Sequence, residues 1–233
     1  MPRSTMLRFA QWHIWLGWLV GVPILMWTVS GLVMVAKPIT EVRDGNLRLP
    51  TPEAEQILPA DTNIAVALPG DASRPVKSVT TAMQQGRAVT TIAYMDGTLE
   101  RYDADGTALG PLSEIEARQM VAAGIKGGDK VISSTAFAAD DVPFDFRRPM
   151  DVWQVTLEDD TNVYVGQHTG KIEAVRTSWW RLFDFMWGLH IMDLQEREDT
   201  SHPILILFAA LAVIGALLGC ILMFRRRKPK VAT

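Results

Sequence analysis

Two long runs of uncharged residues flank a middle segment in which apolar and polar positions alternate. The first run covers residues 9–36 and the second covers residues 203–224. A bilayer core of about 30 Å needs about 20 apolar residues in a helix, so each run is long enough to cross a membrane. The first run is too long for a signal peptide and is not followed by a good cleavage site. We therefore predict two uncleaved transmembrane helices, over residues 12–36 and 203–224.

The middle segment has the pattern of an α+β domain. Thr51-Pro52-Glu53 predicts the start of a short helix, while Ser113 and Glu116 form the capping box of a longer helix that Gly124 ends. Alternating β-branched residues predict antiparallel strands over residues 76–83, 87–95, 98–102, 131–137, 151–158, 161–165 and 171–175.

An internal repeat relates the two halves of this segment. Shifting the chain by 64 residues lays Asp96 on Asp160 and Gly106 on Gly170. The predicted fold class is therefore α+β, with tandem helix and antiparallel-sheet modules over residues 37–110 and 111–177, flanked by two transmembrane helices. Residues 178–192 follow as an interfacial helix, which places Trp187 and His190 on one face and Asp184 on the opposite face.

Charge is strongly segregated along the chain and predicts a topology. Residues 37–201 carry 16 Lys+Arg against 26 Asp+Glu, a net charge of −10, whereas the two ends carry seven cations and no acid. Basic residues next to a span stay on the cytoplasmic side. We therefore expect residues 1–11 and the basic tail 225–233 to be cytoplasmic, and residues 37–201 to be periplasmic, in a bacterial inner membrane. The acidic middle also argues against nucleic-acid binding.

Histidines at the membrane edges are the candidate site residues. His13 lies on one stripe of the first span with Gly17 and Gly21, where an imidazole beside a glycine groove suits an axial haem ligand. The alternative is an interfacial histidine beside a helix-packing groove. His190 lies near the opposite membrane face, about 30 Å away, so the two histidines cannot share one iron.

The second ligand of such a haem stays open at this stage. The inner site could use His13 from two chains, or His13 with Met223, or each face could have its own site, or no haem is bound. The motif Gly215-x-x-x-Gly219 favours close helix pairing or dimerisation. Asp199 and His202 are candidate ligands for iron or another hard cation, although a solvated acidic loop is the simpler interpretation.

Several of these segments carry a family resemblance. Residues 153–155, 162–165, 169–172 and 180–190, together with the His, Leu16-Gly17 and Ser30-Gly31-Leu32 of the first span, resemble the PepSY-associated transmembrane helix family. The resemblance implies PepSY-type modules in the middle segment. Larger relatives have four spans and include inner-membrane proteins that carry haem b and reduce ferric siderophores, whereas this chain has two predicted spans.

The resulting expectation is a PepSY-type inner-membrane protein that serves membrane electron transfer or siderophore-iron acquisition, with haem b as the candidate cofactor. The alternatives are a tethered periplasmic binding or peptidase-inhibitory module, or an accessory subunit of a larger membrane complex. A homodimer is a further expectation. The sequence names no catalytic residue, because it lacks the serine-hydrolase, zinc-protease, nucleotide-binding and dithiol motifs.

Overall fold

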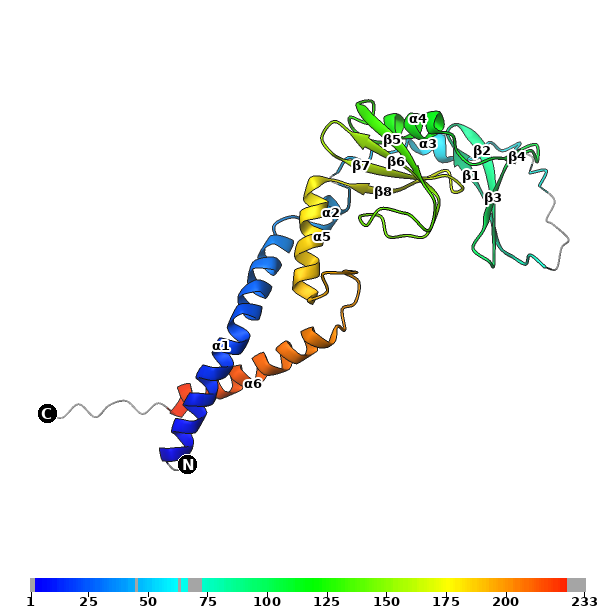
Figure 1. The fold of residues 1–233 in the computed structure, drawn as a ribbon. Coiled ribbons are helices and arrows are strands. Elements are labelled where there is room, and N and C mark those ends of the chain that lie inside the picture. The colour runs from blue at the N-terminus through cyan, green and yellow to red at the C-terminus, as the bar shows by residue number, and fades with distance from the viewer. Residues whose placement is uncertain (1–2, 45, 63, 67–72, 226–233) are drawn as a thin grey trace. The chain divides into compact units, whose positions relative to one another are not determined.

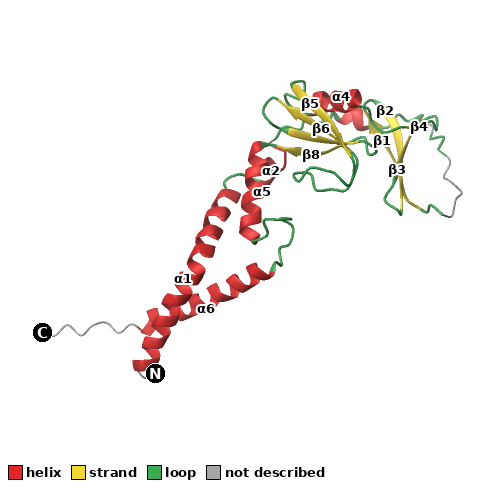
Figure 2. Ribbon diagram, in the orientation of Figure 1, coloured by secondary structure: helices red, strands yellow, loops and turns green. Residues whose placement is uncertain are grey.

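The computed structural model describes residues 3–44, 46–62, 64–66 and 73–225, and it divides into two compact units. The helical unit comprises residues 1–38 and 182–233, and the sheet unit comprises residues 39–181. Figures 1 and 2 show helices in the first unit and two β-sheets in the second. The α+β class and the two apolar terminal helices are confirmed.

Two long helices dominate the helical unit. They are α1 (Arg3–Met34) and α6 (Pro203–Arg225), and both are long and apolar enough to cross a membrane. Their apolar side chains are largely exposed, as Trp18 at 80 % and Phe224 at 84 % illustrate. A soluble protein would bury such surface, so this exposure fits helices that face lipid. The predicted tail beyond residue 225 lies outside the described residues.

α1 and α6 pack against each other as an antiparallel pair. Residues in the first half of α1 contact the last turns of α6, so the helix ends at Arg3 and Arg225 lie at the same end of the pair (Figure 1). The helix α5 (Ser178–Ile191) begins at the predicted interfacial segment. Its last turn contacts α1 near Ser30.

The sheet unit contains two four-stranded antiparallel sheets. The first has strand order β1-β2-β3-β4 and the second β5-β6-β7-β8. Their bounds are β1 Val76–Gln84, β2 Arg87–Tyr94, β3 Leu99–Asp103, β4 Ala108–Leu109, β5 Val131–Phe137, β6 Val152–Leu157, β7 Asn162–Gly166 and β8 Ile172–Arg176. Seven of these strands match the predicted runs, while the two-residue β4 was not predicted.

The second sheet is covered on both faces. The helix α4 (Glu114–Gly124) packs Ala117 and Val121 onto Val155 and Val163, which are all fully buried. On the other face Phe146 stacks on Tyr164 with ring centroids 4.7 Å apart. The predicted capping box is present, because Ser113 Oγ accepts from the Glu116 N–H and the Glu116 carboxylate accepts from the Ser113 N–H.

The helical counterpart in the first half is much shorter. α3 spans only Glu53–Gln56 and begins within the predicted segment, but its N-cap is Pro52 and makes no side-chain hydrogen bond. Proline lacks the oxygen that a side-chain cap requires. A second short helix, α2 (Ile39–Asp44), lies against β8 and was not predicted. The two sheets share one strand order, but the tandem repeat itself stays a prediction.

Candidate functional site

His13 is held between the two long helices. Its Nδ1 lies 3.0 Å from the backbone carbonyl oxygen of Gly215 in α6. A Cβ added at Gly219 would lie 2.9 Å from the imidazole Cε1, closer than such atoms can approach. The imidazole therefore rests on the glycine surface of α6, and the Gly215-x-x-x-Gly219 motif serves helix pairing within one chain.

The glycine stripe predicted beside His13 on α1 is open. Gly17 and Gly21 are exposed, and a Cβ added at either would meet no described atom within 4 Å. Met223 is also exposed, at 66 %. The structure thus brings His13 to the glycines of α6, while Gly17 and Gly21 remain open on the surface of α1.

His190 occupies a different setting at the end of α5. Its Nδ1 lies 3.0 Å from Ser30 Oγ, and its backbone oxygen accepts a hydrogen bond from the Trp27 indole N–H. A Cβ added at Gly31 would be 3.4 Å from the imidazole Cε1. Ser30 is 1 % exposed. The sequence did not identify Trp27 and Ser30 as partners of His190, because a single polar residue in an apolar run does not show which helix it faces.

The hydrogen-bond partners show which ring nitrogen of each histidine acts as a donor. A carbonyl oxygen only accepts, so His13 Nδ1 carries the proton that it donates to Gly215. Ser30 gives its single hydroxyl proton to the Trp27 carbonyl oxygen, 3.1 Å away, so His190 Nδ1 donates to Ser30. No hydrogen bond to Nε2 of either ring is formed among the described residues, so Nε2 is the candidate ligand atom, and a partner at Nδ1 is also what orients metal-binding histidines.

The two imidazoles are far apart. His13 is itself a residue of the first half of α1. His190 contacts α1 at Ser30, which lies 17 positions after His13 in the sequence. At the helical rise this separation is about 25 Å along the axis. The two histidines therefore belong to separate sites, in agreement with the spacing expected from the sequence.

The acidic loop before α6 is organised around one carboxylate. Asp193 accepts backbone N–H groups from Gln195, Glu196, Glu198 and Asp199 at 3.1–3.2 Å. Burial opposes the charged form, but these four donors outweigh it and lower the pKa of Asp193. The carboxylate of Asp199 accepts the Ser201 N–H. Among the described residues no group of three His, Cys, Asp or Glu side chains could hold a metal ion, so Asp199 and His202 gain no third ligand.

An ion pair that the sequence did not predict anchors this loop to α5. Arg197 contacts the carboxylate of Asp184, with a nitrogen–oxygen distance of 2.5 Å, and a Cβ at Gly188 would lie 2.8 Å from Arg197 Cγ. Asp184 is only 7 % exposed, because the loop after α5 folds back over it. The helical period alone could not show that a cation thirteen residues later would fold back onto it.

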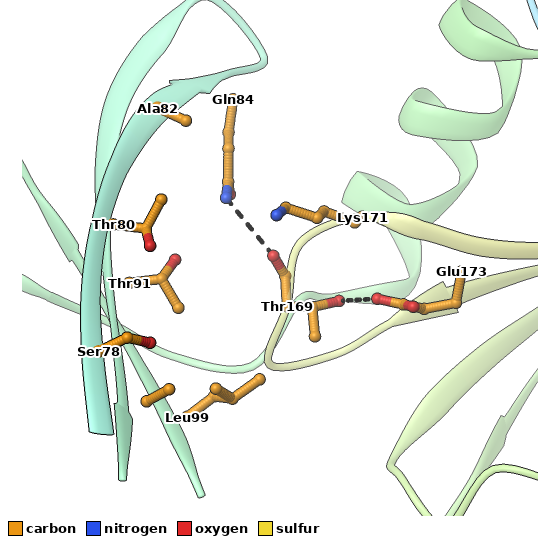
Figure 3. Close-up of a pocket in the computed structure, with 10 residues that line it drawn as sticks. Ser78, Thr80, Ala82, Gln84, Thr91, Leu99, Thr169, Lys171 and Glu173 are labelled. Atoms are coloured by element: carbon orange, nitrogen blue, oxygen red, sulfur yellow. Dashed lines mark hydrogen bonds between the residues drawn. The ribbon is translucent and has the colours of Figure 1, made fainter. Parts of the chain in front are cut away.

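A groove with a mixed lining of apolar and hydroxyl side chains is the candidate site of the sheet unit. It has a volume of about 320 Å³ and lies between one face of the first sheet and the turn from β7 to β8 (Figure 3). Gln84 Nε2 donates to the Thr169 carbonyl oxygen at 3.5 Å, and Thr169 Oγ1 donates to Glu173 at 2.7 Å. Small and hydroxyl side chains make up much of the lining, namely Ser78, Thr80, Ala82, Thr91 and Ala93. Leu99 and Lys171 also line the groove.

A polar cluster, also in the first sheet, is centred on Glu100. The carboxylate accepts the hydroxyls of Tyr94 and Tyr102, both at 2.7 Å, and pairs with Arg74 at 2.9 Å. These hydrogen bonds, led by that of Tyr102, lower the pKa of Glu100 to about 2. The same bond raises the pKa of Tyr102 to about 12. The cluster therefore ties β2, β3 and the approach to β1 together through a charged carboxylate.

Two apolar helices of spanning length, joined to an α+β unit with two antiparallel sheets, define a membrane protein. A scan against family models matches residues 10–233 to the PepSY-associated TM region. The chain therefore belongs to the PepSY-associated TM family, and the resemblance noted in its sequence is confirmed. Comparison with curated proteins and with solved structures finds no match.

Proposed function

We propose that this membrane protein binds haem b through His13 and His190 and transfers electrons across the membrane in the service of siderophore-iron acquisition. One observation carries the proposal: both imidazoles are held through Nδ1, and Nε2 of each forms no hydrogen bond among the described residues. Neutral imidazole with a positioned Nε2 has the donor chemistry of an axial haem ligand. Bound haem iron would supply the one-electron chemistry, while the chain orients the ligands.

The separation of the histidines suits two cofactors at different depths. His13 would hold one haem and His190 the other, since one iron cannot reach both. For the inner site, His13 of a second copy and Met223 are the candidate second ligands. Met223 follows Gly219 by one helical turn on α6. The exposed stripe of Gly17 and Gly21 offers close approach to a second copy or to a larger membrane protein.

The proposed location is a bacterial inner membrane with both termini in the cytoplasm and residues 37–201 in the periplasm. The antiparallel pairing of α1 and α6 supports termini on one side. The cations at the chain ends support the cytoplasm as that side.

The test is an absorption spectrum of the full chain purified from haem-replete cells. We expect a Soret band that weakens by about half in His13→Ala and in His190→Ala, because each removes one site. His168→Ala is the matched control, since His168 lies in the sheet unit and contacts Asp151. A full chain without a Soret band, even after haemin is added, would refute the cofactor.

A second candidate function is a tethered binding or peptidase-inhibitory module, favoured by the groove of the sheet unit shown in Figure 3. In that case a protein partner captured by the full chain should be lost when Thr80→Tyr fills the groove. The same partner should be retained by His13→Ala. Loss of the partner in His13→Ala, together with its retention in Thr80→Tyr, would favour the electron-transfer function.

A further inference from the structure

Four arginines gather around one pocket of the sheet unit. The pocket has a volume of about 320 Å³ and lies where α2 meets the edge strand β8. Arg43 and Arg48 line it from the α2 side, and Arg148 and Arg176 line it from the side of the second sheet. Two acids, Asp44 and Glu173, complete the charged lining. This concentration of guanidinium groups occurs in a segment whose overall charge is −10.

The acids neutralise only half of the arginines. Arg148 pairs with Glu173 at 3.0 Å, and Arg48 makes a longer pair with Asp44 at 3.5 Å. Arg43 is exposed and has no hydrogen-bond or ion-pair partner among the described residues. Arg176 donates from Nε to the backbone oxygen of Asp145 at 2.7 Å. Two positive charges therefore remain uncompensated by the acids that line the pocket.

Arg176 is held in place before any ligand arrives. Its guanidinium lies over the Trp180 ring, 4.0 Å from the centroid. Burial, and then the neighbouring cations Arg148 and Arg147, lower its pKa to about 10 against the opposing effect of Asp145. The side chain still stays charged at neutral pH. A fixed, desolvated cation loses little freedom when it binds an anion.

The chemistry of the lining selects the ligand. Guanidinium groups donate paired N–H bonds to the oxygens of phosphate and carboxylate groups. Arg43 and Arg176 pair with no acid of the lining, and together they offer more N–H donors than the two oxygens of one carboxylate can accept, whereas a phosphate group has four oxygens. We propose that this arginine pocket binds a phosphoryl group, supplied either by a soluble phosphate ester or by a lipid headgroup. Only four residues separate α2 from α1 in the sequence, so a lipid source is within reach of the chain.

The experiment compares the full chain with two pocket variants. The first is Arg43→Gln, which removes an exposed side chain without a partner, and the second adds Arg48→Gln. Lys77→Gln is the matched control, because Lys77 is an exposed cation in β1 outside the pocket. Glycerol 1-phosphate is titrated calorimetrically into each protein in a phosphate-free maltoside detergent, with acetate as the carboxylate probe. Native mass spectrometry counts the phosphatidylglycerol molecules that each protein retains.

We expect glycerol 1-phosphate binding, phosphatidylglycerol retention, or both, to weaken about tenfold in Arg43→Gln and further in the double variant. Lys77→Gln should match the wild type. If only the binding of glycerol 1-phosphate weakens in the pocket variants, the ligand is a soluble phosphate ester. If only the retention of phosphatidylglycerol weakens, the ligand is a lipid headgroup. Absence of both effects, equal loss in Lys77→Gln, or acetate binding as tight as glycerol 1-phosphate would overturn the proposal. The result is independent of haem, so either proposal can fail without the other.

Discussion

At the residue scale, the two histidines of the helical unit are held by different kinds of partner. His13 donates to a backbone oxygen of Gly215, which no side-chain substitution removes. His190 donates to the hydroxyl of Ser30, which a single substitution deletes. The protonation of His190 is therefore open to direct test, while that of His13 follows the packing of α6.

Ser30→Ala should release the ring of His190. The variant removes the acceptor of the Nδ1 proton and the hydroxyl's bond to Trp27, at a cost of about 1 kcal/mol in the free energy of unfolding. Nitrogen chemical shifts of ¹⁵N-labelled His190 should change from one protonated Nδ1 to a mixture of both neutral forms. Thr28→Ala is the control, because Thr28 bonds only within α1, to the Ile24 oxygen. An unchanged His190 in Ser30→Ala would contradict the assignment.

Glu100 should make the sheet unit sensitive to acid. Its pKa of about 2 lies below the ordinary 4.5, so its stabilising effect is complete above pH 4.5 and is lost as the pH falls toward 2. Because the side chain is 35 % exposed, we discount the full effect to about 1–2 kcal/mol. The measurement is the unfolding free energy of wild type and Glu100→Gln between pH 2 and 7.

The Glu100→Gln protein should be less stable at pH 7, with the difference shrinking on acidification. Glu158→Gln is the matched control, since Glu158 makes only an exposed pair with Lys130 at 3.8 Å. A difference between wild type and Glu100→Gln that stays constant down to pH 2 would count against the depressed pKa.

At the element scale, the long helices show what apolar patterning leaves undetermined. Both spans are apolar all round, so the sequence located them without indicating which faces meet. The structure puts His13, Leu16 and Val20 on the α6 side, where Gly215 and Gly219 allow close approach. Contacts with glycine depend on how closely two backbones can approach rather than on hydrophobicity, and a single sequence does not show which helix approaches a glycine.

Gly219→Val should disturb this helix pair, whereas Gly21→Val should not. A side chain at 219 meets the imidazole of His13 at 2.9 Å, while a side chain at 21 meets no described atom within 4 Å. Overpacking of this kind costs about 1–3 kcal/mol, which should lower the thermal midpoint of the full chain in detergent. Equal destabilisation by Gly21→Val would instead indicate that a second molecule covers that stripe.

The strands were more predictable than the helices of the sheet unit. Strand runs such as 131–137 follow from alternating β-branched residues, and the α4 capping box follows from Ser113 and Glu116. By contrast, α2 has six residues and β4 has two, too few for a period to appear. The burial of Asp184 was not predicted, because its partner Arg197 comes from a loop with no periodic pattern. Local rules thus found the regular elements, while contacts distant in sequence required the structure.

At the scale of the whole molecule, charge and helix pairing point to one topology. The acids all lie between Glu41 and Asp199, and cations lie between each uncharged run, 9–36 and 203–224, and the nearer end of the chain. Two antiparallel helices that both cross a membrane would place both chain ends on the same side of it. The sequence supports this arrangement through the distribution of cations, and the contact of His13 with Gly215 supports it independently.

Cysteine labelling should reveal on which side of the membrane the sheet unit and the C-terminal tail lie. In a Cys220→Ser background, Lys126→Cys should react with a membrane-impermeant maleimide in intact spheroplasts, because Lys126 is exposed in the sheet unit. Thr233→Cys, at the last position of the sequence, should react only after the membrane is permeabilised. Labelling of both positions, or only of Thr233→Cys, in intact spheroplasts would contradict the proposed orientation.

The position of α2 beside β8 also protects the protein from aggregation. An exposed edge strand can recruit the edge of another molecule through its unpaired backbone groups. β8 is such an edge, and α2 lies against it with Val42 only 1 % exposed. A fragment that starts after residue 44 would lack α2 and would expose the edge of β8 to other molecules. A fragment of the sheet unit should therefore begin at Ile39, where α2 begins.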